Sequence, residues 1–256
     1  MFITTLKEMG VPVAVATRRF NMPRSTFYKS SGKDDKELSD LIIEIAFKHP
    51  SYGYRRVTAL LRRKGIIVNH KKVYRVYRSA GIGKPANKSK KRRYIHQFTP
   101  VKALYPGHIW AVDFIHDSIE TGRQVRIFNI IDLFSRRVFE PEIDYSLPGN
   151  KIALHINRLF LRYGSPRIIR RDDGPEFRSK EFQSVIRRWR VREEVIPPGQ
   201  PSDNGFIESF HGSMREEILD QEIFENLKEA KQKILCWIND YNTQRPHSAL
   251  EYKTPM

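Results

Sequence analysis

Three acidic residues stand where a carboxylate needs a chemical partner. Asp113 interrupts the apolar run 110–115, where a buried charge is costly unless it is paired or binds a cation. Asp172 follows the short run 168–171, at the expected carboxyl end of a strand, where open α/β sheets gather ligands. Glu208 lies on a predicted helix. Such oxygen ligands suit Mg²⁺ or Mn²⁺, and two ions could activate a hydroxyl on one side of a phosphorus and stabilise the leaving oxygen on the other.

Each carboxylate also has an ordinary interpretation. Asp172 and Asp173 precede Gly174, and Asp-Asp-Gly sequences commonly form turns. A glutamate on an exposed helix face is usually only solvated. Three further acidic residues are alternative ligands: Asp117, Asp132 and Asp203. Of these, Asp132 is better explained as a residue of a strand-end turn.

The charge balance indicates a polyanionic partner. Lys and Arg number 46 against 29 Asp and Glu, which gives a net charge of +17. This balance favours a nucleic acid, although ribosomal proteins share it. The single cysteine, Cys236, is predicted to be a buried thiol in a cytosolic protein. The first twenty residues resemble no secretory signal and no run of eighteen apolar residues exists, so we expect a cytoplasmic, nucleoid-associated protein.

The helix that carries Glu208 is predicted to have one packed face and one working face. Its apolar stripe has helical spacing and comprises Ile207, Phe210, Met214 and Ile218. The other face carries Glu208, His211, Gly212 and Arg215. Proline-rich residues 197–201 place its start near Ser202, with Ser202 or Asp203 as cap. We expect a polymer backbone to approach at Gly212 and a phosphate to contact Arg215, while His211 and His247 are candidates for positioning DNA or water.

The first third of the chain is predicted to be helical and basic. Residues 1–32 have a helix-turn-helix outline, residues 33–82 form a second helical domain with helices at 36–48, 54–64 and 70–80, and residues 83–104 form a basic linker. The residues predicted to contact DNA here are Arg24, Ser25, Arg55, Arg56, Lys71, Lys72, Arg75, Lys90, Lys91 and Arg92.

The pattern changes after Pro106. Predicted strands lie at 109–115, 125–133, around 137–143, 167–171 and 191–196, and predicted helices lie at 149–164, 179–190 and 226–241. Three consecutive strands followed by alternating helices and strands favour an α/β fold, a mixed sheet with flanking helices, over 105–241. Residues 242–256 are predicted to be an irregular C-terminal tail.

Several motifs resemble those of the OrfB transposases of bacterial insertion sequences. They are Trp110–Phe114, Asp172–Phe177, Phe206–Gly212, Tyr241–Asn242 with Arg245–Leu250, and upstream Tyr52–Arg56, Val68–Arg75 and Ser25–Tyr28. The resemblance covers nearly the whole chain and implies a retroviral-integrase-like catalytic core of the ribonuclease H superfamily. It implies Asp113, Asp172 and Glu208 as a catalytic triad that holds two Mg²⁺ ions, with Mn²⁺ as a substitute.

The implied activity is cleavage of the element's ends, followed by attack of the 3′-hydroxyl on target DNA without a covalent protein–DNA intermediate. The implied partners are double-stranded DNA, further copies of the chain, and an OrfA protein in trans or as a fusion. The chain departs from the family at Asp173, where asparagine is usual, so that an additional negative charge lies near the metals.

Two other functions are consistent with parts of the sequence. One is a non-catalytic DNA-binding regulator with a relic core, for which we would expect one of the three carboxylates to be missing, and none is. The other is a ribonuclease H-type hydrolase acting on RNA–DNA hybrids, which would not need two helical DNA-binding modules before its core.

Overall fold

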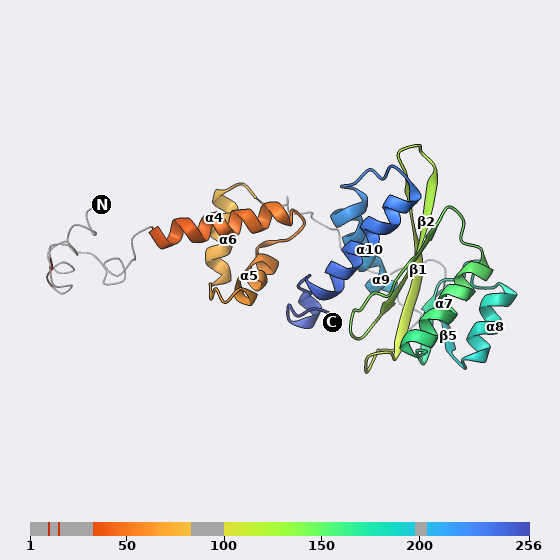
Figure 1. The fold of residues 1–256 in the computed structure, drawn as a ribbon. Helices are drawn as coiled ribbons and strands as arrows, with labels where there is room; N and C mark the ends of the chain where they lie inside the picture. Colours follow the sequence, from red (N-terminus) through yellow and green to blue (C-terminus); the bar gives the residue numbers. More distant parts are fainter. Residues whose placement is uncertain (1–9, 11–14, 16–32, 83–99, 198–203) are drawn as a thin grey trace. The chain divides into compact units, whose positions relative to one another are not determined.

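The computed structural model describes residues 10, 15, 33–82, 100–197 and 204–256. The chain divides into two compact units, Met1–Pro85 and Ala86–Met256 (Figure 1). The predicted helix-turn-helix of residues 1–32 and most of the predicted linker lie outside the described residues. The same holds for five predicted DNA contacts: Arg24, Ser25, Lys90, Lys91 and Arg92.

The first unit contains three helices around a small apolar core. They are α4 (Lys33–Lys48), α5 (Tyr54–Arg63) and α6 (His70–Ser79). Ile42, Val57 and Val73 contribute one fully buried side chain from each helix. The side chain of Asn69 accepts a hydrogen bond of 2.9 Å from the backbone N–H of Lys71 and caps α6. The predicted helices at 36–48, 54–64 and 70–80 agree with these three helices to within three residues at each end.

The second unit is built on a five-stranded mixed sheet. Its strands are β1 (Ile109–Ser118), β2 (Gln124–Asp132), β3 (Glu142–Asp144), β4 (Ile168–Arg171) and β5 (Arg192–Val195). The strand order is β3-β2-β1-β4-β5, with antiparallel pairing from β3 to β1 and parallel pairing from β1 to β5. The predicted mixed sheet is confirmed. The third strand begins later than predicted, because Val138 makes only an isolated bridge to Ile131.

Helices cover both faces of this sheet (Figure 1). One face packs against α7 (Gly149–Tyr163) and α8 (Lys180–Arg188). The other packs against α9 (Gly205–Met214), a π-helical turn η2 (Arg215–Leu219) and α10 (Leu227–Thr243). Successive strand residues point to opposite faces, so β1 divides its apolar residues between the two cores.

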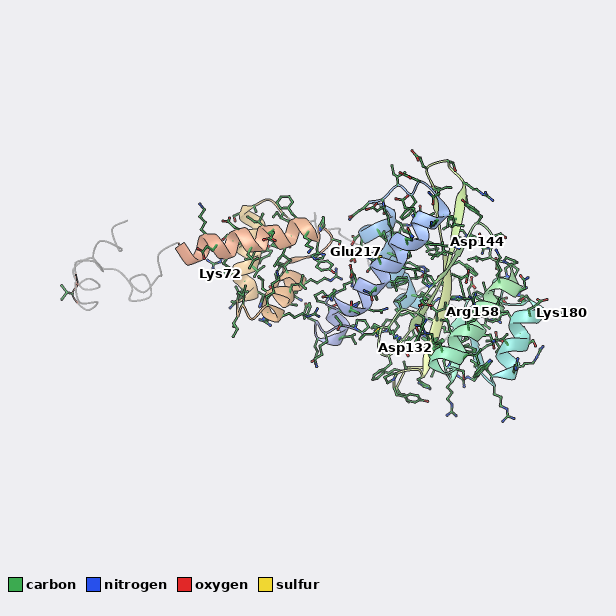
Figure 2. The ribbon with its side chains drawn as sticks, viewed as in Figure 1. Lys72, Asp132, Asp144, Arg158, Lys180 and Glu217 are labelled. Carbon is green, nitrogen blue, oxygen red and sulfur yellow. The ribbon has the colours of Figure 1, made fainter. Side chains whose placement is uncertain are left out.

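Residues 242–256, predicted to be an irregular tail, pack against the core, and the first two of them form the end of α10. The side-chain amide of Asn242 donates to the Val138 carbonyl at 2.8 Å and accepts from the Val138 N–H at 3.0 Å. Arg245 forms an ion pair of 2.7 Å with Glu217 of η2 (Figure 2). A 3₁₀ turn, η3 (Ser248–Leu250), follows. These bonds tie the end of the chain to the sheet and to η2.

Cys236 is exposed, so the prediction of a buried thiol was wrong. The buried stripe of α10 contains Ile234, Ile238 and Tyr241, at helical spacing, and Cys236 lies away from that stripe. Among the helices that the structure describes, none is long and apolar enough to cross a membrane.

We predict that Glu217→Ala lowers the free energy of unfolding of this unit by about 3–5 kcal/mol, because it leaves the Arg245 guanidinium buried without its partner. The two side chains are only 7% and 5% exposed. All three tryptophans, Trp110, Trp189 and Trp237, lie in this unit, so urea unfolding followed by tryptophan fluorescence reports on it.

Glu222→Ala is the matched control. Glu222 pairs with Lys233 at 2.6 Å, but both side chains are about 40% exposed. Its removal should change the free energy of unfolding by no more than about 1 kcal/mol, as for other surface ion pairs. Equal losses in the two variants would contradict a special contribution of the buried pair.

Candidate active site

Asp113 lies on the face of β1 that packs against α9. Residues 109, 111 and 115 of the strand belong to the apolar cluster on this face, and alternation places Asp113 with them. Its Oδ1 accepts a hydrogen bond of 2.8 Å from the backbone N–H of Phe114. The pKa of Asp113 is raised to about 6, mainly by burial and also by the negative charges of Asp172 and Glu208, while the Phe114 hydrogen bond opposes the rise. The three predicted carboxylates therefore interact electrostatically.

The sheet register explains why Asp172 lies near Asp113. In the parallel pairing of β1 with β4, Ala111 lies opposite Arg170. Continuing this register by two residues brings Asp172 level with Asp113, at the carboxyl end of β4. Asp172 is exposed there and accepts a hydrogen bond of 3.2 Å from the Gly174 N–H, as expected for a turn. A Cβ on Gly174 would stand only 3.2 Å from Oδ1 of Asp172, so a larger residue would crowd this carboxylate.

The loop after β4 is fixed by arginines that the sequence analysis did not single out. Arg126 of β2 donates to the Glu176 carboxylate at 2.6 Å and lies over the ring of Phe114, 4.5 Å from its centroid. This pair joins the loop that carries Asp172 to the strand next to Asp113. Its only signal in the sequence was an arginine inside an otherwise apolar strand.

The carboxylate of Asp173 forms an ion pair with another arginine, Arg178. Arg178 donates from Nε to Oδ1 at 2.8 Å and from Nη2 to Oδ2. These hydrogen bonds hold the pKa of Asp173 below its usual value. The additional negative charge in the loop is therefore paired within the loop itself.

Glu208 lies in the first turn of α9, on the opposite side of that helix from its packed stripe. Ile207, Phe210 and Met214 are buried, as predicted, while Glu208 is at the exposed edge of the site. Its carboxyl is still partly removed from water, which raises its pKa. The helix begins at Gly205 with Asn204 as N-cap residue, three residues later than predicted. The proposed caps, Ser202 and Asp203, lie outside the described residues.

The neighbouring acidic alternatives already have partners. Asp132 ends β2 and accepts from the N–H groups of Phe134 at 2.8 Å and Ser135 at 2.9 Å, which confirms its interpretation as a turn residue (Figure 2). Asp117 lies 3.8 Å from Arg215, the predicted phosphate contact. Arg215 also pairs with Asp220 at 3.5 Å and donates to the backbone carbonyl of His116. Asp203 lies outside the described residues.

The two candidate histidines have different surroundings. His211 lies one turn after Glu208, and its Nδ1 is 3.7 Å from Oδ2 of Asp113. Burial and the charge of Arg215 lower the pKa of His211 to about 4. His247 is not a surface group: it is buried, and its Nε2 contacts the Tyr241 carbonyl oxygen at 2.9 Å. Only His211 lies beside the carboxylates.

The donor set fits a divalent cation that binds together with a phosphate. Within the described part of the chain, no lysine or arginine forms an ion pair with Asp113, Asp172 or Glu208. No three His, Cys, Asp or Glu side chains there form a closed metal cluster either. Mg²⁺ does not need such a cluster, because it commonly uses one or two carboxylates, water and substrate phosphate.

The helical unit presents a surface of unbalanced positive charge. Neither α5 nor α6 contains an acidic residue. The exposed predicted contacts are Arg55, Lys71 and Arg75, while Arg56 and Lys72 are half-buried. Lys71 and Arg75 are one turn apart on α6, an arrangement that is unfavourable for like charges in water and that a polyanion relieves.

Comparisons with known proteins agree with this architecture. The chain matches two family models described as integrase core domain, over residues 104–201 and 178–255, and one described as HTH-like domain, over residues 33–92. It is 33% identical over 251 residues to the insertion element IS407 uncharacterized 31.7 kDa protein of Burkholderia multivorans, covering 97% of this chain and 91% of that protein. It is 27% identical to the putative transposase InsK for insertion sequence element IS150 of Escherichia coli, covering 96% and 92% of the two chains.

The fold is also similar to a solved structure, a chain of the simian T-cell lymphotropic virus intasome in complex with PP2A regulatory subunit B56 gamma. The TM-score is 0.54 at 17% sequence identity, over 77% of this chain and 72% of that one. The mixed sheet with its flanking helices is thus the ribonuclease H-like fold of integrase catalytic cores, as predicted. Within that class, the chain belongs to the transposases of bacterial insertion sequences.

The raised pKa of Asp113 generates a stability prediction. The pKa is about 6 in the folded protein against an ordinary value of 3.8, so the folded state holds this proton more tightly and loses stability as the pH rises through that interval. In metal-free buffer near pH 8, Asp113→Asn should raise the free energy of unfolding by about 2 kcal/mol, with a much smaller effect near pH 4.

Urea unfolding followed by tryptophan fluorescence measures this change. Asp144→Asn is the control with the opposite sign, because a hydrogen bond from Lys151 lowers the pKa of Asp144. Loss of this carboxylate should reduce stability at the higher pH. If Asp113→Asn instead destabilises the protein at both pH values, Asp113 is not held in an unfavourable charged state.

Proposed function

We propose that the protein is a metal-dependent DNA transposase that cleaves the ends of its element and joins the resulting 3′-hydroxyls to target DNA. One observation carries the proposal: the register of β1 and β4, continued one residue past the end of β4, brings Asp172 level with Asp113, and the charges of Asp172 and Glu208 both act on Asp113. Gathering three carboxylates in this way is unfavourable unless a cation compensates their repulsion. Asp113, Asp172 and Glu208 are the proposed catalytic residues and metal ligands.

These side chains would hold two Mg²⁺ ions, or Mn²⁺ in their place. Bound ions supply activation of the attacking hydroxyl and neutralise charge at the phosphate and the leaving oxygen. The carboxylates orient the ions, and the scaffold keeps each carboxylate at a fixed place on the sheet or helix. Apart from its chain neighbours and the nearby backbone of α9, no atom of the described residues lies within 4 Å of the position that a Cβ on Gly212 would occupy, so α9 leaves room for a DNA backbone. The proposal needs no protein nucleophile.

The remaining predicted residues hold DNA in this proposal. The cations of α5 and α6, including Lys72 (Figure 2), would contact phosphates of the terminal repeats or the target. Arg215, whose charge acts on His211 beside Asp113, is the proposed contact with the reacting strand. Residues 1–32 and the linker 83–104 would add further contacts before the core at 105–241 and its C-terminal segment 242–256. We also propose action as a homo-oligomer on DNA in the cytoplasmic nucleoid, with OrfA as a partner or fusion.

We predict that Glu208→Gln abolishes end cleavage and strand transfer while DNA binding changes little, because the substitution removes a ligand charge and keeps the side-chain volume. A Mg²⁺-dependent nicking and joining assay on DNA that contains the element's ends measures activity, and a gel shift measures binding. Asp172→Asn should behave in the same way.

The matched control is Asp173→Asn, which makes the same chemical change at the adjacent position. Because Arg178 pairs with Asp173, this variant should keep activity within a few-fold of the original protein. Equal loss of binding and activity in Glu208→Gln would count against its assigned role. DNA binding without cleavage by the unaltered protein would favour the relic regulator, and cleavage of RNA–DNA hybrids would favour the hydrolase.

We predict that Lys71→Ala weakens DNA binding uniformly across sequences and lowers the salt dependence of the binding constant by about one unit of slope, as expected for one lost phosphate contact. Lys71→Ala combined with Arg75→Ala should lower it by about two units. Lys180→Ala, on α8, is the control and should leave the slope unchanged. An unchanged slope in the double variant would exclude phosphate contacts by this face of α6.

A further inference from the structure

A fully buried amide lies next to Asp113 on the neighbouring strand. Asn129 of β2 pairs directly with Asp113 in the antiparallel register, and it is 0% exposed. Alternation along β2 places it on the same face as Ile127 and Ile131, toward α9. Burying an amide in an apolar strand costs free energy unless its polar atoms are hydrogen-bonded. The contacts of the Asn129 side chain therefore indicate why an amide is present at this position.

The contacts of Asn129 lead to His211. Its Nδ2 lies 3.1 Å from Nε2 of His211 and 3.8 Å from the sulfur of Met214. Its Oδ1 has no hydrogen-bond partner among the residues that the structure describes. The Nδ2 group of Asn129 is thus in hydrogen-bond contact with the imidazole ring of His211.

The orientation of the Asn129 amide assigns the proton of His211 to one ring nitrogen. With the NH₂ group facing the ring, Nε2 accepts, and the proton of the neutral ring is assigned to Nδ1. Nδ1 is the atom that lies 3.7 Å from Oδ2 of Asp113. The order of groups is therefore amide donor, imidazole, carboxylate. Oδ2, the carboxylate oxygen near Nδ1, is the one that does not accept the Phe114 hydrogen bond.

His211 also connects the two elements that carry the carboxylates. It lies three residues after Glu208, so both side chains project from the same face of α9. The distance to Asp113 exceeds that of a formed hydrogen bond, and such contacts commonly shorten when substrate binds. A small movement of α9 toward β1 would close it.

We propose that Asn129 and His211 are positioning residues, in which the buried amide fixes the ring of His211 and its Nδ1–H orients the Asp113 carboxylate toward the metal ions. This inference rests on the proposed function, because it assigns a role at the same site. Groups that hydrogen-bond metal ligands typically affect metal affinity or activity by roughly 10–100-fold when removed.

Variants of His211 test the inference. His211→Leu removes both nitrogens, and we expect Mn²⁺ binding, measured by isothermal titration calorimetry, to weaken by roughly 10–100-fold. The kcat of strand transfer should fall by a similar factor while the KM for DNA stays unchanged. The melting temperature in chelator should change little. His211→Asn places an amide N–H where Nδ1 stood and should restore part of both losses, whereas His211→Gln places it at the Nε2 position and should not.

A double-mutant cycle tests the link to the strand. Asn129→Leu alone should weaken Mn²⁺ binding, and combining it with His211→Leu should add little further loss, because both residues act through one contact. Additive losses, or Mn²⁺ affinity within twofold of the original in His211→Leu, would overturn the positioning role. If His211→Leu does not fold, failure of His211→Asn to bind Mn²⁺ better than His211→Gln overturns it equally.

Failure of the proposed function gives a different result. In that case the unaltered protein itself would neither bind Mn²⁺ at the Asp172-dependent site nor join DNA ends. If the unaltered protein is active and the His211 variants keep its Mn²⁺ affinity and strand-transfer rate, only the positioning role is overturned.

Discussion

The burial of Asp113 on the central strand, next to the charges of two further carboxylates, is the constraint on which the rest of this unit depends. Asp113 is half-buried, and the charges of Asp172 and Glu208 work against its ionisation. The local hydrogen bond from the Phe114 N–H offsets only part of that cost. The apolar cores on the two faces of the sheet hold β1 and α9 in place, so packing far from the site stabilises an arrangement that is unfavourable at the site.

The arginines of this unit are distributed in a way that preserves the negative charge of the site. Arg126 pairs with Glu176, Arg178 with Asp173, and Arg245 with Glu217. Each pair satisfies an acidic residue that supports the scaffold. In the parts of the chain that the structure covers, the three proposed ligands have no such cation, so their charge is available to metal ions and DNA.

Local sequence patterns predicted most of the fold, because they depend on periodicity and turn residues. The stripe of Ile207, Phe210 and Met214 gave the packed face of α9, and the start of this helix was misplaced only because Ser202 and Asp203 are equally good caps. Asp113 and Asp172 were selected as candidates because a strand-central acid and a strand-end acid are unusual at those places, and Glu208 because it lies on the face of its helix opposite the apolar stripe.

The features that the sequence did not reveal depend on contacts between distant residues. Asn129 is separated from His211 by 82 positions, and Arg126 from Glu176 by 50. The only local sign of either pair is a polar residue, Arg126 or Asn129, within the apolar run of β2, and it does not identify the partner. Cys236 was misjudged for a related reason: its neighbours are apolar, but the rotation of α10 in its final packing leaves it in solvent.

The π-helical turn from Arg215 to Leu219 fixes the number of residues that must separate α9 from the segment that follows it. A π turn holds about one more residue than an α-helical turn, so it offsets the rotation of everything that follows α9. Glu217, the middle residue of this turn, forms the buried ion pair with Arg245. Deleting a single residue here would preserve α9 up to Met214 but rotate the following side chains by about 100° around the helix axis. Chain length in this turn is therefore as constrained as residue identity.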